Sequence, residues 1–208
     1  MKMNLPNKLT CLRMIMIPLF LFFMIFPGIC GYTVSRIIAA LLFALTAMTD
    51  MLDGKIARKY NLVTDFGKFM DPLADKLMVF GAMIGTIVMT YETSSAKVGL
   101  ATLVTDENYI IFAKVFAWAA FLIIFRELAV TSMRMVVSGA SGIVVAANIF
   151  GKMKTVSQIV GVVIILVEPI LWNKFVFSYI SLGIMMITTM YSGYTYFRAY
   201  WPHINPNK

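Results

Sequence analysis

The sequence predicts an all-α membrane protein with six transmembrane helices around a polar cavity that opens to the cytoplasmic side. Of its 208 residues, 60% are hydrophobic and only 13% are charged. A soluble domain of this size could not bury so much apolar surface in one core. Two stretches, 14–30 and 175–197, contain no charged residue and are long enough to cross a bilayer. No linker or second module interrupts the chain, so we expect a single membrane domain over 1–208.

The other four expected spans are shorter apolar stretches that end in charged residues. They become long enough to cross a bilayer only if each helix continues into its charged end. Such an end must face protein or water, because lipid would leave its charges unsatisfied. On that basis the six expected spans are 12–31, 34–58, 70–92, 109–136, 152–168 and 174–198.

The distribution of basic residues predicts the orientation. With six spans, both termini and the links after spans two and four lie on one side, where most Lys and Arg residues fall. The positive-inside rule places this side in the cytoplasm of a multi-pass protein of the cell membrane. The net charge of +8 therefore indicates topology and contact with membrane lipids, and we expect no nucleic-acid partner. One histidine, His203, and two cysteines leave no zinc ligand set.

Half of the ten acidic residues lie between positions 50 and 75, at helix ends on the cytoplasmic side. Asp50 and Asp53 are three positions apart, and Asp71 and Asp75 are four apart, so each pair shares one helix face. Two neighbouring helices can direct both pairs at one point. Four carboxylates that close together need cations to remain ionised. Oxygen ligands of this kind suit Mg²⁺ or Mn²⁺, bound as one or two ions.

Small and basic residues accompany these carboxylates. Gly54 and Ala57 remove side-chain bulk where a nucleotide would need to approach the backbone. Arg58, one turn after Gly54, can offer a planar fork of donors to a diphosphate. Asp65 lies outside the spacing, and we expect it in the link between the helices. Solvated helix caps would explain one pair of aspartates, but not four aspartates at this spacing together with the glycines and the arginine.

The segment 50–75 resembles the signature of the CDP-alcohol phosphatidyltransferase family, Asp-x2-Asp-Gly-x2-Ala-Arg-x8-Gly-x3-Asp-x3-Asp, at every position. The resemblance implies that Asp50, Asp53 and Asp71 bind divalent metal, and that Asp75 both binds metal and acts as the base. It also implies two ions, CDP-diacylglycerol as the donor and a homodimeric assembly. The residues implied to bind the CDP group are Gly54, Ala57, Arg58, Thr64 and Gly67.

A second group of polar residues indicates the acceptor. Arg126 and Glu127 interrupt the fourth span, and buried arginines in a bilayer are costly and usually functional. Further basic residues enter from the same side, so a cationic pocket for a second phosphate is predicted, built by Thr10, Arg13, Arg126, Arg134 and Lys152. Lys154 enters the fifth span beside Lys152. Two simpler explanations stay open: an internal ion pair of Arg126 with an aspartate, and plain positive-inside topology for Lys154.

The identity of the acceptor rests on a further resemblance. The segments 4–13, 126–134 and 151–155 are similar to those of bacterial phosphatidylglycerophosphate synthases. They favour sn-glycerol 3-phosphate over inositol phosphate or serine. From another class, the rival is a carboxylate-lined cation transporter, whose acidic groups should be distributed across the membrane and accompanied by internal repeats. Here the aspartates gather at one face and no convincing repeat is found.

Overall fold

The computed structural model describes residues 4–60, 64–95, 106–141, 149–172 and 175–203, without the side chains of 51–59, 65, 68, 95, 106, 140, 141 and 203. Its main elements are helices, which confirms the all-α prediction with six long helices. They are α1 (Leu5–Ile25), α2 (Tyr32–Lys59), α3 (Asp65–Ser95), α4 (Asp106–Ser141), α5 (Ile149–Leu171) and α6 (Val176–Tyr200), followed by a 3-10 turn, η1 (Trp201–His203).

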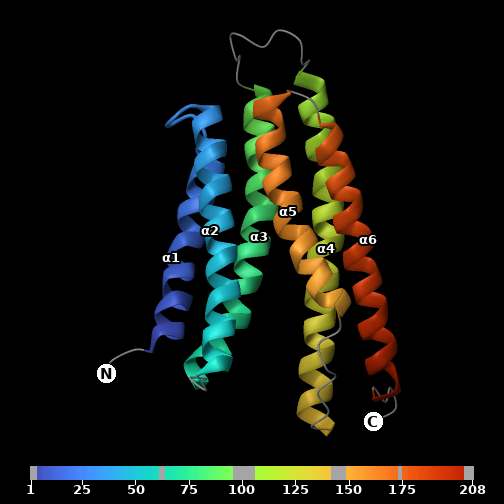
Figure 1. Cartoon of the computed structure of the whole chain (residues 1–208). Helices are drawn as coiled ribbons and strands as arrows, with labels where there is room; N and C mark the ends of the chain where they lie inside the picture. The colour runs from blue at the N-terminus through green and yellow to red at the C-terminus, as the bar shows by residue number, and fades with distance from the viewer. Residues whose placement is uncertain (1–3, 61–63, 96–105, 142–148, 173–174, 204–208) are drawn as a thin grey trace.

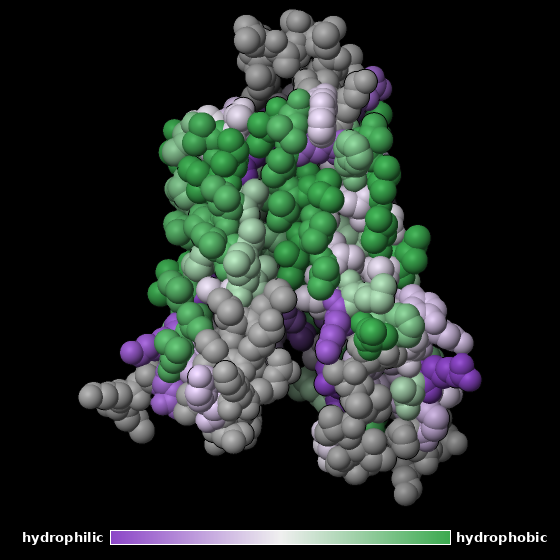
Figure 2. Space-filling view, viewed as in Figure 1, coloured by the Kyte–Doolittle hydropathy of each residue, from purple (hydrophilic) through white to green (hydrophobic). Residues whose placement is uncertain are grey.

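The six helices run side by side along one direction, and both termini lie at the same end of the bundle (Figure 1). Each helix is long and apolar enough to cross a membrane, which indicates a multi-pass membrane protein. Hydrophobic side chains cover the middle and upper parts of the molecule in Figure 2, whereas hydrophilic side chains gather toward the end with the termini. The predicted continuation of apolar helices into charged ends is confirmed by α2 and α3, which include the aspartate-rich segments.

The predicted ends of the first span and the predicted place of Asp65 were wrong. The first span was expected at 12–31, but α1 begins at Leu5 and ends at Ile25. Pro6 is tolerated in the first turn, where its missing N–H has no helical partner, and Pro27 disfavours helical geometry in the preceding residue. Gly31, at φ 88°, then allows the tight turn into α2. Asp65 was expected in the link, but it is the first residue of α3.

The helix α1 packs against both α2 and α3. Its buried residues recur every three or four positions, at Thr10, Arg13, Ile17, Phe20 and Met24, so a single face carries the whole contact. The apolar members of this face fill the core, while its first two polar members lie near the charged end of α2 and α3. The buried face of α1 is polar near one end and thus brings a hydroxyl and a guanidinium to the aspartates.

The helix α6 packs against α4 and α5. Glu168, near the end of α5, accepts hydrogen bonds from the backbone N–H groups of Phe177 (2.8 Å) and Ser178 (2.6 Å) in the first turn of α6. A carboxylate at this position satisfies N–H groups that have no helical partner and lies favourably at the positive end of the helix dipole. This contact fixes the start of α6 against α5, far from the aspartates.

Gly85 provides a test of how tightly α1 and α3 pack. A methyl group at this position would lie 2.8 Å from the Met24 Sδ and 3.0 Å from its Cβ. Gly85→Ala is therefore expected to destabilise the protein by about 1–3 kcal/mol, the usual cost of overpacking. The midpoint of thermal unfolding in detergent should fall. Gly183→Ala, where nothing lies within 4 Å, is the matched control and should leave the midpoint unchanged or higher. Equal midpoints for both variants would contradict this packing.

Candidate functional site

Three of the predicted aspartates gather where α2 ends and α3 begins. Asp50 belongs to α2, and Asp71 and Asp75 belong to α3. Asp50 lies close enough to Asp71 and to Asp75 for electrostatic interaction with each. Asp53 is in the same helical segment of α2, and its side chain lies outside the described residues. The antiparallel arrangement of α2 and α3 thus brings together carboxylates that are some twenty residues apart in the sequence.

The helix α1 supplies direct partners for two of these carboxylates. The Thr10 hydroxyl donates a hydrogen bond to Asp71 Oδ1 (2.8 Å), and the Arg13 guanidinium lies 2.5 Å from Asp50 Oδ1. Arg13 is completely buried. The sequence grouped Thr10 and Arg13 with the acceptor phosphate, whereas the structure places both against the aspartates. Together they orient two carboxylates and partly balance their charge.

The start of α3 is held by the first turn of α1. Thr64 caps α3, accepting a hydrogen bond from the Gly67 N–H (3.1 Å) and donating one to Asn7 Oδ1 (2.9 Å). A methyl group at Gly67 would lie 3.4 Å from both of these oxygens and 3.7 Å from Asp71 Oδ2. Thr64 and Gly67 therefore lie beside Asp71, and their contact with the donor stays a prediction. The side chains of Ala57 and Arg58, and the surroundings of Gly54, lie outside the described residues.

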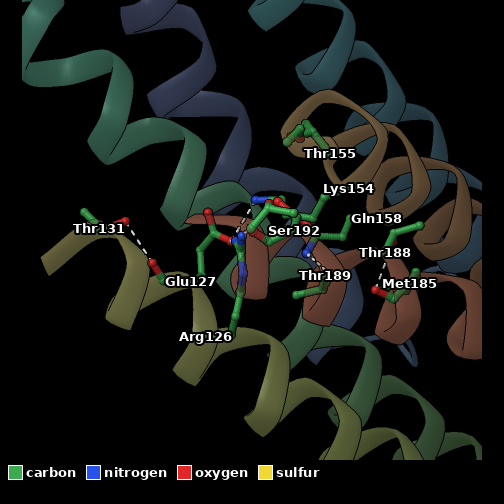
Figure 3. A network of polar contacts seen from close by, with 12 residues as sticks. Arg126, Glu127, Thr131, Lys154, Thr155, Gln158, Met185, Thr188, Thr189 and Ser192 are labelled. Atoms are coloured by element: carbon green, nitrogen blue, oxygen red, sulfur yellow. Dashed lines mark hydrogen bonds and ion pairs between the residues drawn. The ribbon is translucent and has the colours of Figure 1, made fainter. Parts of the chain in front are cut away.

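A second polar cluster joins α4, α5 and α6 (Figure 3). The carboxylate of Glu127 accepts from the Arg126 Nη1 (3.0 Å) and from the Lys154 Nζ (2.7 Å), using the same oxygen for both. The Arg126 Nη2 also donates to the Ser192 hydroxyl (2.9 Å). Arg126 and Lys154 are buried, so this cluster holds two cations and one carboxylate out of water. Arg126 therefore forms an internal ion pair, which was one of the open explanations, but its partner is a glutamate rather than an aspartate.

Asp75 connects the two clusters. It interacts electrostatically with Asp50 of the first cluster and with Glu127 and Lys154 of the second, as well as with its neighbour Lys76. A line of charged groups therefore runs from Arg13 through the aspartates to Arg126. Such a line can hold two anionic groups next to each other, one on bound cations and one on fixed basic side chains.

The remaining residues of the predicted acceptor pocket lie at the exposed ends of their helices. Arg134 is exposed, with its guanidinium 6.0 Å from the centre of the Tyr196 ring. Lys152 is also exposed, two positions before the buried Lys154. Lys154 thus lies near Asp75 and shares the Glu127 carboxylate with Arg126, whereas Arg134 and Lys152 are exposed.

The comparison with known proteins decides the family. A family model described as CDP-alcohol phosphatidyltransferase matches residues 3–191. The chain belongs to this family. It is 38% identical to the CDP-diacylglycerol–glycerol-3-phosphate 3-phosphatidyltransferase of Bacillus subtilis, over 95% of each chain. It is 33% identical to the protein of the same name from Pseudomonas fluorescens, over 97% of this chain and 92% of that one. A probable phosphatidylglycerophosphate synthase of Mycobacterium tuberculosis is 31% identical over 93% of this chain and 79% of its own length.

The donor set of this CDP-alcohol phosphatidyltransferase fits a hard divalent cation. Asp50, Asp71 and Asp75 offer only carboxylate oxygens, the ligands that Mg²⁺ and Mn²⁺ prefer. Within the described side chains, no three His, Cys, Asp or Glu residues are near enough to one another to hold an ion by themselves. Asp53 belongs to the predicted ligand set but not to those side chains. The chemistry of the carboxylates, together with their shared position, supports a metal site.

Sequence reasoning missed several residues of the two clusters. Glu127 was noted only as an interruption of a span, although its neighbour Arg126 and the nearby Lys154 required a counter-charge. Asn7 and Ser192 gave no signal, because amides at helix starts and serines within membrane helices are common. Plain topology stayed open as an explanation of Lys154, and its burial and ion pair show that it belongs to the Glu127 cluster.

Proposed function

We propose that this chain transfers the phosphatidyl group of CDP-diacylglycerol to sn-glycerol 3-phosphate and releases CMP, giving phosphatidylglycerophosphate. The names of the relatives motivate the substrates. The observation that carries the proposal is the adjacency of aspartates and buried cations: Asp75 interacts with Asp50 and also with Lys154. Carboxylates alone would suit a metal–diphosphate group. A neighbouring pair of buried cations suits an acceptor that is itself phosphorylated.

In the donor half of the site, Asp50, Asp53, Asp71 and Asp75 would hold one or two Mg²⁺ or Mn²⁺ ions. When bound, these ions neutralise charge that develops on the diphosphate. Arg58 would contact the diphosphate directly. The donor's acyl chains would remain in the bilayer. The nucleotide would bind beside the aspartates, where short side chains leave space for it, at Gly54, Ala57, Thr64 and Gly67.

The reaction is an in-line displacement at the phosphorus that carries the diacylglycerol. The free hydroxyl of glycerol 3-phosphate forms the new P–O bond, and the bond to the bridging diphosphate oxygen breaks. CMP leaves with that oxygen. Asp75 accepts the proton of the attacking hydroxyl, which requires its carboxylate to be near the acceptor. Its position between the aspartates and the Lys154 cluster is consistent with this role.

The acceptor phosphate would bind to Arg126 and Lys154, with Arg134 and Lys152 guiding it from the surface. Thr10 and Arg13 would act on the carboxylates instead. We place the site in a polar cavity on the cytoplasmic side of the cell membrane, with both termini cytoplasmic. The chain would function as one domain over 1–208, and its assembly as a homodimer belongs to the same proposal.

Lys154→Met is expected to weaken acceptor binding selectively. Methionine keeps the length of the side chain but removes a charge-assisted contact worth roughly 1.5–3 kcal/mol. The acceptor KM should rise about 10- to 150-fold, because each 1.4 kcal/mol is a factor of ten. The KM for CDP-diacylglycerol should change much less. Lys114→Met, at an exposed position of α4, is the control for lost positive charge. An unchanged acceptor KM in correctly inserted Lys154→Met protein would contradict the pocket.

The proposed function is tested with purified protein, CDP-diacylglycerol and a panel of alcohols: glycerol 3-phosphate, inositol phosphate, serine and glycerol. CMP release and the mass of the lipid product are measured for each. We expect phosphatidylglycerophosphate with glycerol 3-phosphate and little product with the others. Preferential reaction with inositol phosphate would keep the chemistry and change the acceptor. If none of the four alcohols supports CMP release, phosphatidyl transfer to these alcohols is refuted.

A further inference from the structure

The helix α6 carried no predicted site residue, yet it touches the most buried part of the second cluster. The Ser192 hydroxyl accepts a hydrogen bond from the Arg126 Nη2 (2.9 Å). The next residue, Gly193, lies directly under the arginine side chain. A methyl group there would be 2.8 Å from the Arg126 Nε, 3.0 Å from its Cγ and 3.5 Å from its Cδ.

These distances show that the arginine lies flat on the backbone of α6. A heavy-atom distance of 2.8 Å to a methyl carbon is shorter than van der Waals contact allows, so any side chain at Gly193 would displace Arg126. Glycine costs about 1 kcal/mol relative to alanine in a helix interior. The helix alone would thus be more stable with alanine at position 193. Glycine fits there because Arg126 occupies the space that a side chain would fill. Gly183, three turns earlier in α6, has nothing within 4 Å and serves no such purpose.

The direction of the guanidinium is fixed by contacts from two sides. Glu127 Oε2 accepts a hydrogen bond from the Arg126 Nη1 (3.0 Å), and the Ser192 hydroxyl accepts one from Nη2. The Arg126 Nε has no hydrogen-bond partner within the part of the chain that the structure describes. The orientation of the guanidinium therefore depends on its two terminal nitrogens and on the surface of α6 beneath its stem.

We infer that Ser192 and Gly193 are positioning residues for the acceptor phosphate: they act through Arg126 and determine where its guanidinium lies. The inference rests on the proposed function of Arg126. It assigns α6 a part in acceptor specificity without contact between α6 and the substrate. A shift of Arg126 would weaken binding of the acceptor phosphate and leave the donor site, on α2 and α3, unaffected.

The main test compares Gly193→Ala with Gly183→Ala in the same helix. The acceptor KM should rise about tenfold or more in Gly193→Ala, the effect of losing one contact to a charged group. The donor KM should stay near that of the unsubstituted protein, and Gly183→Ala should change neither. Ser192→Ala should also raise the acceptor KM, whereas Ser192→Thr keeps the hydroxyl and should restore it. Equal increases of both KM values would overturn the inference.

A double-substitution cycle tests whether Gly193 acts through Arg126. All three atoms that a methyl group would crowd belong to Arg126, so Gly193→Ala should have little further effect in an Arg126→Ala protein. The cycle is measured twice, by acceptor KM and by thermal unfolding without substrates. Additive effects in the unfolding cycle would overturn the positioning contact. Absence of any reaction with glycerol 3-phosphate in the unsubstituted protein would instead refute the proposed function, and with it the acceptor role of this contact.

Discussion

Asp75→Asn is expected to lower turnover by at least about 10²-fold, the lower range for loss of a general base. Asparagine preserves the shape of the side chain but cannot accept the proton of the attacking hydroxyl. The position of Asp75, between Asp50 and the Lys154–Glu127 pair, motivates this role. Turnover is measured as CMP release at saturating concentrations of both substrates.

The matched variant is Asp53→Asn, which would remove a metal ligand and not the base. Donor binding, measured by titration with CDP-diacylglycerol, should survive better in Asp75→Asn than in Asp53→Asn. This difference separates the role of the base from a general loss of charge in the site. Near-normal turnover of Asp75→Asn would refute the base assignment.

Removal of divalent cations is expected to abolish CMP release, and Mg²⁺ or Mn²⁺ should restore it. The carboxylates of the site need cations to coexist, and the donor diphosphate needs its charge neutralised. The measurement is a titration with chelator followed by addition of each metal. Chelator that has been saturated with Mg²⁺ beforehand is the control and should not inhibit. Full activity in excess free chelator would remove the metal from the mechanism.

The helices of this protein were predictable because hydropathy and length decide which segments can cross a bilayer. Charged residues blurred the ends of four spans, and the prediction that the helices continue into their charged ends was correct, although α3 begins at Asp65 rather than at 70. The ends of α1 were misplaced because a hydropathy window weighs Pro6 and Pro27 lightly, whereas their backbone geometry decides where a helix can begin and end.

The aspartate cluster was predictable because its spacing is local: residues three or four positions apart share a helix face. Contacts between distant helices were not. Thr10 and Arg13 were assigned to a phosphate because nothing in their own segment shows which helices α1 packs against. Packing of α1 on α2 and α3 instead places them on Asp71 and Asp50. The same limit hid Ser192 and Gly193, since small residues occur widely in membrane helices.

Transfer of the phosphatidyl group is tested most directly by following the phosphate that carries the diacylglycerol. CDP-diacylglycerol is labelled with ³²P at this phosphate and incubated with purified protein, Mg²⁺ and glycerol 3-phosphate. The label should appear in phosphatidylglycerophosphate, the released CMP should be unlabelled, and both products should depend on glycerol 3-phosphate. Label released into a water-soluble nucleotide, or labelled lipid product formed at the same rate without glycerol 3-phosphate, would contradict phosphatidyl transfer to this acceptor.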